Sequence, residues 1–275
     1  MRCDLHSHSN CSDGLLSPAD LVERALLRGV DVLALTDHDE LGGLPAARAA
    51  AAHWGLRLID GVEISVLWEG FTLHVLGLAV DPHNQDLAGG LAQVRAGRES
   101  RARRIAQSLE DSGIQGALEG ARRHAKNPGL LSRAHFARHL VDAGHAPDTH
   151  TVFRKFLTPG KPGFVPHQWP TLAQALHWIH GAGGIAVIAH PARYGLGAAQ
   201  CDRLLAEFVD LGGRSVEVVT GSHAPEEFVT WAHHARRFGL LASAGSDFHG
   251  PGEGYRDLGQ VPALPPGCEP VWSQL

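Results

Sequence analysis

Nine side chains able to bind metal ions recur along this chain, six from histidine and three from acids. They are spread over almost the whole sequence, mostly at the ends of apolar runs: His6, His8, Asp13, His38, Glu63, His74, His190, Asp247 and His249. A structural zinc site gathers its ligands within one short segment. Ligands delivered strand by strand instead predict a multinuclear metal pocket at the mouth of a barrel, where enzymes of that architecture build their active sites.

The local spacing suggests how these ligands are used. Side chains alternate along a strand, so His6 and His8 project to one side and can hold one ion together. Glu63 ends an apolar run, and a carboxylate can bridge two cations whereas a neutral imidazole cannot. His74 lies inside an apolar run, where a single histidine is more often a core residue, but the other eight candidates favour a ligand. Imidazole and carboxylate ligands without thiolates suit zinc, iron or manganese.

The elements that must position these residues form a regular series. Short apolar runs predict seven strands at residues 2–6, 30–36, 57–63, 72–80, 184–189, 215–220 and 240–244. Helices separate most of them, and the first helix is predicted to begin with Ser17 as N-cap and Pro18 at its first position. The alternation predicts an α/β fold, a distorted seven-stranded barrel. No Gly-x-Gly-x-x-Gly or P-loop motif follows a strand, which argues against a nucleotide cofactor.

The alternation is interrupted in the middle of the chain. We expect residues 1–82 to form the first part of the barrel, 83–166 a mostly helical basic insertion that caps the substrate, and 167–275 the second part. Residues 95–161 hold 13 Lys and Arg against 6 acids, a net charge of +7, and the remaining residues hold 11 against 23, a net charge of −12. A basic segment beside a metal pocket would attract an anionic substrate.

Composition sets the class of protein. The chain has 275 residues, of which 44% are hydrophobic and 19% charged, as expected for a folded α/β protein. No stretch approaches the roughly 18 apolar residues of a membrane span. The four cysteines form no Cys-x-x-Cys pair and are too few for a disulfide scaffold. We therefore expect a cytoplasmic protein with no membrane partner, acting as a monomer or a small homo-oligomer.

The order of the motifs resembles one known family. His6-Ser7-His8, Thr36-Asp37-His38-Asp39, Gly61-Val62-Glu63-Ile64, Ala189-His190-Pro191 and Ser246-Asp247-Phe248-His249 are similar to the motifs of the PHP family, the polymerase and histidinol phosphatase metal-dependent phosphoesterases. The resemblance implies a distorted seven-stranded barrel with two to three divalent metal ions, manganese being favoured over iron or zinc. The implied ligand sets are His6, His8, Glu63 and Asp247; Glu63, His74 and His190; and Asp13, His38 and His249. Asp13 stands where some relatives carry histidine.

A segment of the insertion resembles one particular branch of this family. Residues 131–138 look like a segment of the nucleotide-processing branch, in which Arg133 and His135 would contact the substrate phosphate. A guanidinium offers phosphate two parallel hydrogen bonds. The alternative is that Ser132 caps a helix and that both side chains point to solvent.

The branch implies hydrolysis of nucleotide phosphates. We expect release of the 3'-phosphate of adenosine 3',5'-bisphosphate to give AMP, by attack of a metal-bridging hydroxide, with Asp13, Glu63, Asp247 and His135 in catalytic roles. His135 or metal-bound water would protonate the leaving group, and Asp37 and Asp39 would orient ligating histidines. The alternatives are a 5'-3' exoribonuclease acting on short 5'-phosphorylated RNA and a histidinol-phosphate-type phosphatase.

Other classes of protein are less well supported. Many amidohydrolases also begin with His-x-His, but they bridge their metals through a lysine on a barrel strand, and here Lys126, Lys155 and Lys161 all lie in the insertion. A non-catalytic metal-binding module would need no phosphate-contacting groups. Recognition of duplex DNA is not expected, because no aromatic series or known binding motif accompanies the arginines. The expected substrate is a small anionic nucleotide or short oligonucleotide.

Overall fold

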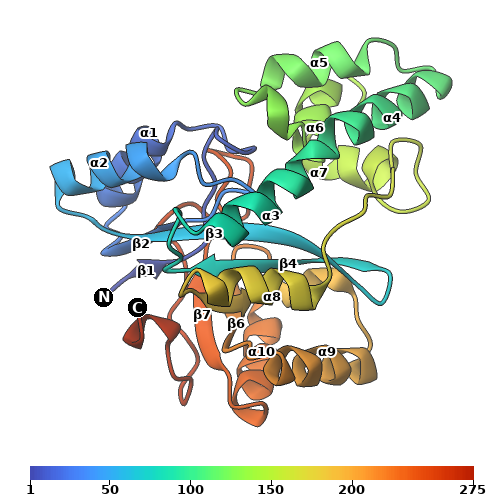
Figure 1. Ribbon diagram of the computed structural model, residues 1–275. Helices are drawn as coiled ribbons and strands as arrows, with labels where there is room; N and C mark the ends of the chain where they lie inside the picture. Colours follow the sequence, from blue (N-terminus) through green and yellow to red (C-terminus); the bar gives the residue numbers. More distant parts are fainter.

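A seven-stranded sheet forms the centre of the computed structural model, which describes residues 1–275 (Figure 1). Its strands follow one another in sequence order: β1 (Cys3–Asp4), β2 (Val32–Leu35), β3 (Arg57–Trp68), β4 (Phe71–Leu78), β5 (Ile185–Ile188), β6 (Ser215–Thr220) and β7 (Leu241–Gly245). The first and last strands also meet, because the Leu5 N–H donates to the carbonyl of Ala244 and the Asp247 N–H to that of His6. The sheet is therefore a nearly closed barrel, as predicted.

One pair of strands departs from the predicted alternation with helices. β3 continues to Trp68, and two residues later β4 begins and runs antiparallel to it. β4 is also antiparallel to β5, whereas the other neighbouring strands are parallel. The start of β4 therefore lies at the barrel mouth, where His74 pairs in register with Ser65, two residues after Glu63. This explains why His74 sits early in its apolar run while the other candidate ligands follow theirs.

Helices cover the outside of the barrel: α1 (Pro18–Leu27), α2 (Leu44–Trp54), α8 (Leu172–Gly181), α9 (Ala198–Asp210) and α10 (Pro225–Arg237). α1 begins as predicted, since the Ser17 hydroxyl accepts the Asp20 N–H at 3.2 Å and Pro18 is the first helical residue. Its face formed by Leu21, Val22 and Ala25 is fully buried. A membrane-crossing helix would need a longer apolar stretch than any helix of this structure provides.

A second group of helices stands over the barrel mouth (Figure 1). It contains α3 (Gln85–Ala96), α4 (Arg98–Asp111), α5 (Ala117–His124), α6 (Arg133–Asp142), α7 (Thr149–Val152) and a π-helical segment, η2 (Phe153–Leu157). α3 packs Leu87 and Leu91 against the barrel core, whereas residues between 102 and 165 share a separate core of 15 buried side chains.

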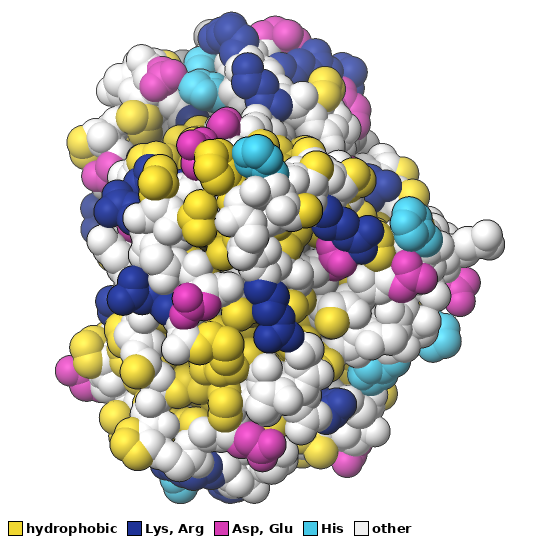
Figure 2. Space-filling model, turned by 90° about the vertical axis from the view of Figure 1, so that its left-hand side faces the viewer, with side chains coloured by type: hydrophobic (Ala, Val, Ile, Leu, Met, Phe, Trp, Pro, Cys, Tyr) yellow, Lys and Arg dark blue, Asp and Glu magenta, His cyan; other side chains and the backbone are white.

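We call residues 98–165 the cap. Figure 2 shows Lys and Arg side chains gathered at the top of the molecule, where the cap helices lie. The divisions at residues 83 and 166 stay a prediction, although the separate core lies within them.

Candidate metal centre

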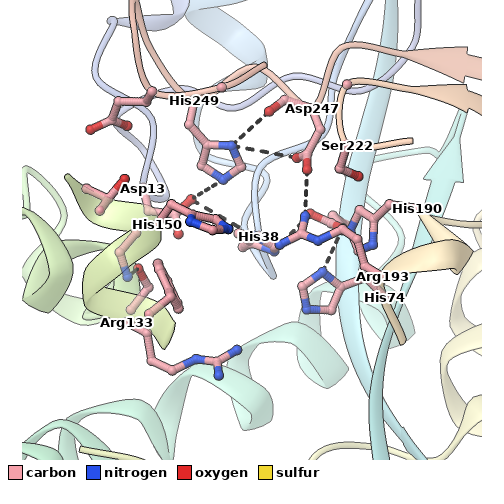
Figure 3. A pocket seen from close by; sticks show the side chains of 18 of the residues that line it. Asp13, His38, His74, Arg133, His150, His190, Arg193, Ser222, Asp247 and His249 are labelled. Atoms are coloured by element: carbon pink, nitrogen blue, oxygen red, sulfur yellow. Dashed lines mark hydrogen bonds and ion pairs between the residues drawn. The ribbon is translucent and has the colours of Figure 1, made fainter. Parts of the chain in front are cut away.

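The nine candidate ligands converge at the barrel mouth. Three groups have ligand atoms within 4.8 Å of one another: His6, His8, Glu63 and Asp247; His38, Glu63 and His74; and His8, Asp13, His38 and His249. The ninth residue, His190, places Nε2 3.0 Å from Oε1 of Glu63. Figure 3 shows how the labelled side chains of Asp13, His38, His74, His190, Asp247 and His249 lie around one pocket. Residues from both ends of the chain thus meet in one place, and their role as metal ligands stays a prediction.

The first group has the arrangement that a cation would require. Nε2 of His6 and Nε2 of His8 lie 3.2 and 3.3 Å from Oε2 of Glu63, and 3.4 and 3.3 Å from Oδ1 of Asp247. The His6 and His8 Nε2 atoms and Glu63 Oε2 are buried without a hydrogen-bond partner. Buried polar atoms are rarely left unpaired in proteins. A divalent cation among these atoms would satisfy them, so the residues fit the metal that the motifs imply.

Glu63 lies at the centre of the whole arrangement. Its Oε1 is 2.8 Å from Nδ1 of His74 and faces His190, while its Oε2 is 3.0 Å from Nδ1 of His38 and faces the first group. Burial raises the pKa of this carboxyl, but the surrounding imidazoles outweigh burial and hold the pKa well below its usual range. An ionised carboxylate with a different set of neighbours on each oxygen is suited to bridging two cations.

The third group is built around Asp13. Its Oδ1 is 3.4 Å from Nε2 of His249 and 4.0 Å from Nε2 of His38, and it is buried without a hydrogen-bond partner. Burial raises the pKa of Asp13, but His38 and His249 lower it further, to well below the usual value. The geometry also differs from the ligand sets implied by the motifs, because His38 joins the second group and His8 the third.

Two acids near the centre do not act as predicted. Asp37 accepts hydrogen bonds from the Ser9 N–H at 2.7 Å and from the hydroxyls of Ser9 and Ser12 at 2.6 and 2.5 Å. Asp39 accepts from the Ser65 N–H at 3.1 Å and pairs with Arg98. Neither carboxylate is hydrogen bonded to a histidine ring. The prediction that they orient ligating histidines is wrong; Asp37 instead holds the loop that carries Asp13, and Asp39 ties the barrel to α4.

The acid that does orient a histidine is Glu217, which the sequence reasoning missed. Its Oε1 lies 3.0 Å from Nδ1 of His6, and its Oε2 accepts the His190 N–H at 2.6 Å. A carboxylate on Nδ1 keeps the hydrogen there and leaves the Nε2 lone pair free for a metal. The available signal was an acid in the middle of the otherwise apolar run of residues 215–220.

A cavity of about 710 Å³ separates the metal centre from the cap. This volume is within the range of small-molecule sites, roughly 300–1,000 Å³. Its floor is formed by seven of the nine candidate ligands, all except His6 and His8, and its walls include five arginines: Arg98, Arg101, Arg133, Arg138 and Arg193. A cavity with clustered candidate metal ligands on one side and guanidinium groups around it is suited to an anion.

Arg133 is one of these arginines and has no carboxylate partner. Its Nη1 donates to the carbonyl of Leu157 at 3.1 Å, and its guanidinium lies over the ring of Phe153, 5.6 Å from the ring centre. Burial lowers its pKa to about 10, and Arg193 and Arg98 add to that effect. Ser132 does cap α6, but Arg133 lines the cavity instead of pointing to solvent. Its placement is compatible with phosphate contact.

His135 is placed differently. It is 1% exposed and is not among the residues that line the cavity. Its Nδ1 accepts the Ser132 N–H at 3.0 Å, which completes a capping box at the start of α6. Burial lowers its pKa to about 4, so the ring is neutral near pH 7. The structure therefore gives no support for direct contact between His135 and a substrate, and its solvent-facing alternative is not observed either.

The lysines are absent from the cavity. Lys126, Lys155 and Lys161 do not line it. A lysine-derived bridge of the amidohydrolase type therefore has no residue to form it here, and the central position is held by Glu63.

Comparisons with known proteins agree with this arrangement. The PHP domain model matches residues 4–122. A 3',5'-nucleoside bisphosphate phosphatase of Chromobacterium violaceum is 53% identical over 99% of this chain and 95% of its own length. The 5'-3' exoribonuclease Rnm of Salmonella typhimurium is 47% identical over 98% of this chain and 92% of its own.

A solved structure from Chromobacterium violaceum, named an amidohydrolase and holding sulfate without metal, is 51% identical. It superposes with a TM-score of 0.97 over 100% of this chain and 95% of its own. The first part of the sequence matches the family model, and the whole length matches a phosphatase and a ribonuclease. The chain belongs to the PHP family of metal-dependent phosphoesterases, a family of hydrolases.

Proposed function

We propose that this enzyme hydrolyses the 3'-phosphate of a nucleoside 3',5'-bisphosphate, with adenosine 3',5'-bisphosphate giving AMP and phosphate. The observation that carries the proposal is a single cavity with seven of the nine candidate ligands on one side and Arg133 of the cap, which has no carboxylate partner, on the other. The relative that is 53% identical over nearly the whole chain is named for this activity. In this proposal the insertion at residues 83–166 serves as the substrate cap.

The candidate ligands hold two to three divalent ions in this proposal, with manganese favoured. When bound, such ions neutralise the phosphate, lower the pKa of water and stabilise the entering and leaving oxygens. Glu63 and Asp247 supply the negative charge that keeps cations together in a buried site. Asp13 supplies the third carboxylate. Without this neutralisation a phosphate dianion repels an attacking hydroxide.

In this proposal Arg133 binds the scissile phosphate from the cap side. Its guanidinium can donate two parallel hydrogen bonds to phosphate oxygens, and its half-buried setting strengthens them. The leaving 3'-oxygen needs a proton. Because His135 is neutral and buried behind the cavity wall, we assign this proton to solvent that reaches the cavity rather than to His135.

A second candidate function is 5'-3' exoribonuclease activity on short RNA with a 5'-phosphate. The relative of that name is 47% identical over 98% of this chain. Tyr255 favours this candidate, because it lines the cavity and yet is 76% exposed at its rim. An exposed aromatic ring can stack on the base of a following nucleotide. Both candidates cleave at the 3' side of a nucleoside that carries a 5'-phosphate.

A phosphate-release panel with added manganese tests the proposal. The substrates are adenosine 3',5'-bisphosphate, 5'-phosphorylated short RNA, histidinol phosphate and an aryl phosphate. We expect the bisphosphate to give the highest kcat/KM. Faster turnover of the RNA would select the second candidate. Turnover of histidinol phosphate or of the aryl phosphate alone would overturn the nucleotide assignment.

A further inference from the structure

Arg101 on α4 is a buried cation that the proposed chemistry does not use. It lines the cavity although its residue is only 7% exposed. Its Nε donates to the carbonyl of Val165 at 3.0 Å, and its guanidinium lies over the ring of Trp169, 5.4 Å from the ring centre. These contacts fix one edge and one face of the group. Arg101 forms no ion pair, so its remaining N–H groups have no carboxylate partner.

The other arginines of the cavity differ from Arg101 in their ion pairs. Arg98 pairs with Asp39, Arg138 with Glu253 and Arg193 with Asp247, so three of the five are neutralised by barrel residues. Arg101 and Arg133 alone have no carboxylate partner. A buried charge is costly unless it is paired. Burial lowers the pKa of Arg101, and the neighbouring cations Arg133 and Arg98 lower it further.

Each of these two cations without a carboxylate partner can bind an anionic group. We propose that Arg101, held against Trp169, binds the phosphate of the substrate that is not hydrolysed, while Arg133 and the metal centre hold the one that is. This inference rests on the proposed function and deepens it. The bound group is the 5'-phosphate of a nucleoside whose 3'-phosphate ester is cleaved.

The position of Arg101 on α4 fits a second phosphate. Arg98 opens the helix and is tied to Asp39, which directly follows the candidate ligand His38. Arg101 comes three residues later, so it lies on the same side of the helix, about 4.5 Å farther along the axis. α4 runs away from the barrel mouth (Figure 1). A group bound by Arg101 would therefore lie farther from the candidate ligands than a group bound at the start of the helix.

Such a subsite would serve both relatives' chemistries. A nucleoside 3',5'-bisphosphate carries a monoester at its 3' side, and RNA with a 5'-phosphate carries a diester there. In each case the first nucleotide presents a 5'-phosphate at the same distance from the scissile bond. One subsite thus places the 3' ester on the metal centre whether or not a polymer follows.

The test compares substrates that differ only in the 5'-phosphate. kcat/KM is measured for adenosine 3',5'-bisphosphate and for adenosine 3'-monophosphate in the manganese-loaded wild type, R101Q, R101K and R104Q. Arg104 is an exposed cation on the same helix that does not line the cavity, so R104Q controls for the general loss of one charge. We expect the bisphosphate-to-monophosphate ratio of kcat/KM to fall about 10- to 100-fold in R101Q, by loss of a charged hydrogen bond. The ratio should fall less in R101K.

Two results would contradict the role of Arg101 as a phosphate subsite. An equal fall for both substrates in R101Q would assign Arg101 a structural role through Val165 and Trp169. The same fall of the ratio in R104Q would indicate a diffuse field instead of a subsite. Either result would overturn the inference.

A binding measurement separates this inference from the proposed function. With saturating inorganic phosphate at the metal centre, binding of adenosine 5'-monophosphate is compared with binding of adenosine, by tryptophan fluorescence or calorimetry. We expect the wild type to bind adenosine 5'-monophosphate more tightly than adenosine. In R101Q this difference in affinity should shrink about tenfold. If the wild type does not hydrolyse the bisphosphate but this binding difference holds, the proposed function fails and the subsite stands. Equal binding of the two ligands by the wild type overturns the subsite.

Discussion

Oε1 of Glu217 lies 3.0 Å from Nδ1 of His6, on the side of the ring opposite to Nε2, which faces the other candidate ligands. Both side chains are fully buried. The second oxygen of Glu217 accepts the backbone N–H of His190, a further candidate ligand, at 2.6 Å. One carboxylate therefore sets the ring orientation of one candidate ligand and the backbone position of another.

Replacing Glu217 with Gln should weaken metal binding without removing a candidate ligand. An amide nitrogen can donate to Nδ1, which would shift the His6 hydrogen to Nε2 and block that lone pair. We expect metal affinity to fall about 10- to 100-fold, as for other partners of ligating histidines. The measurement is a competition titration of manganese or zinc against a chelating dye. E226Q on the exposed face of α10 is the control; equal affinity in wild type and E217Q would contradict the assigned role.

Glu63 is the residue on which the whole centre depends. E63Q removes the charge between the candidate metal groups while keeping the shape of the side chain, and H8A removes a ligand shared by two groups. We expect each variant to lose turnover by about a thousandfold or more, to bind fewer metal ions per chain by plasma mass spectrometry, and to keep its circular dichroism spectrum. A chelator should abolish wild-type activity, and added manganese should restore it.

The control for these variants is H53A, because His53 is exposed on α2, away from the centre. It should retain both turnover and metal content. Near-normal turnover of E63Q or H8A with reduced metal content would count against the metal-dependent scheme.

Arg138 joins the cap to the third candidate group. Its Nε and Nη2 donate to Glu253 at 2.7 and 2.6 Å, and Nη2 also donates to the backbone carbonyl of Asp13 at 2.6 Å. R138K keeps the charge but loses the two-pronged geometry. We expect the manganese concentration for half-maximal activity to rise about tenfold, since a charged hydrogen bond contributes roughly 1.5–3 kcal/mol.

Saturating manganese should restore most of the turnover of R138K, because Asp13 itself is retained. E253Q should shift the metal requirement in the same direction, and R123K on the exposed face of α5 should not. An unchanged metal requirement in R138K would show that the clamp does not position Asp13.

The sequence predicted the fold, and the meeting of the candidate ligands at the barrel mouth, for a physical reason. Apolar runs of period two mark buried strands, and a titratable residue directly after such a run can only lie at the barrel rim. All seven strands were predicted, and His38, His190 and Asp247 each follow one of them. The hairpin of β3 and β4 was not predicted, because a strand of 12 residues with a two-residue turn resembles two separate apolar runs.

The hydrogen-bond partners of the candidate ligands were much harder to predict than the positions of the ligands themselves. Glu217 lies within a strand, and Asp37 and Asp39 flank a ligand, so proximity in sequence pointed to the wrong acids. What decides is the register between distant strands, which brings β6 behind β1 across the barrel. The contact that joins Arg138 to Asp13 spans 125 residues, and no local pattern encodes it.

The buried ring of His135 should make the free energy of unfolding depend on pH. Burial lowers its pKa to about 4 from an ordinary value of 6.5. Between these values the unfolded chain binds a proton that the folded chain does not, so this residue makes stability fall as the pH falls from 6.5 towards 4. The effect is on the order of 3 kcal/mol at the acid end. H135Q removes the titrating group, while glutamine at this position preserves the capping box with Ser132.

We therefore expect H135Q to gain stability relative to wild type at pH 4.5 compared with pH 7, measured by urea unfolding of both metal-free proteins. Every other titrating group is common to the two proteins, so the difference between them isolates His135. A stability difference that is equal at both pH values would show that the ring is not buried as a neutral group. Turnover of H135Q at pH 7 should stay within about fivefold of wild type, because general acid catalysis contributes 10²–10⁴-fold and the buried ring supplies none. A loss of that size would instead restore His135 to direct contact with the substrate.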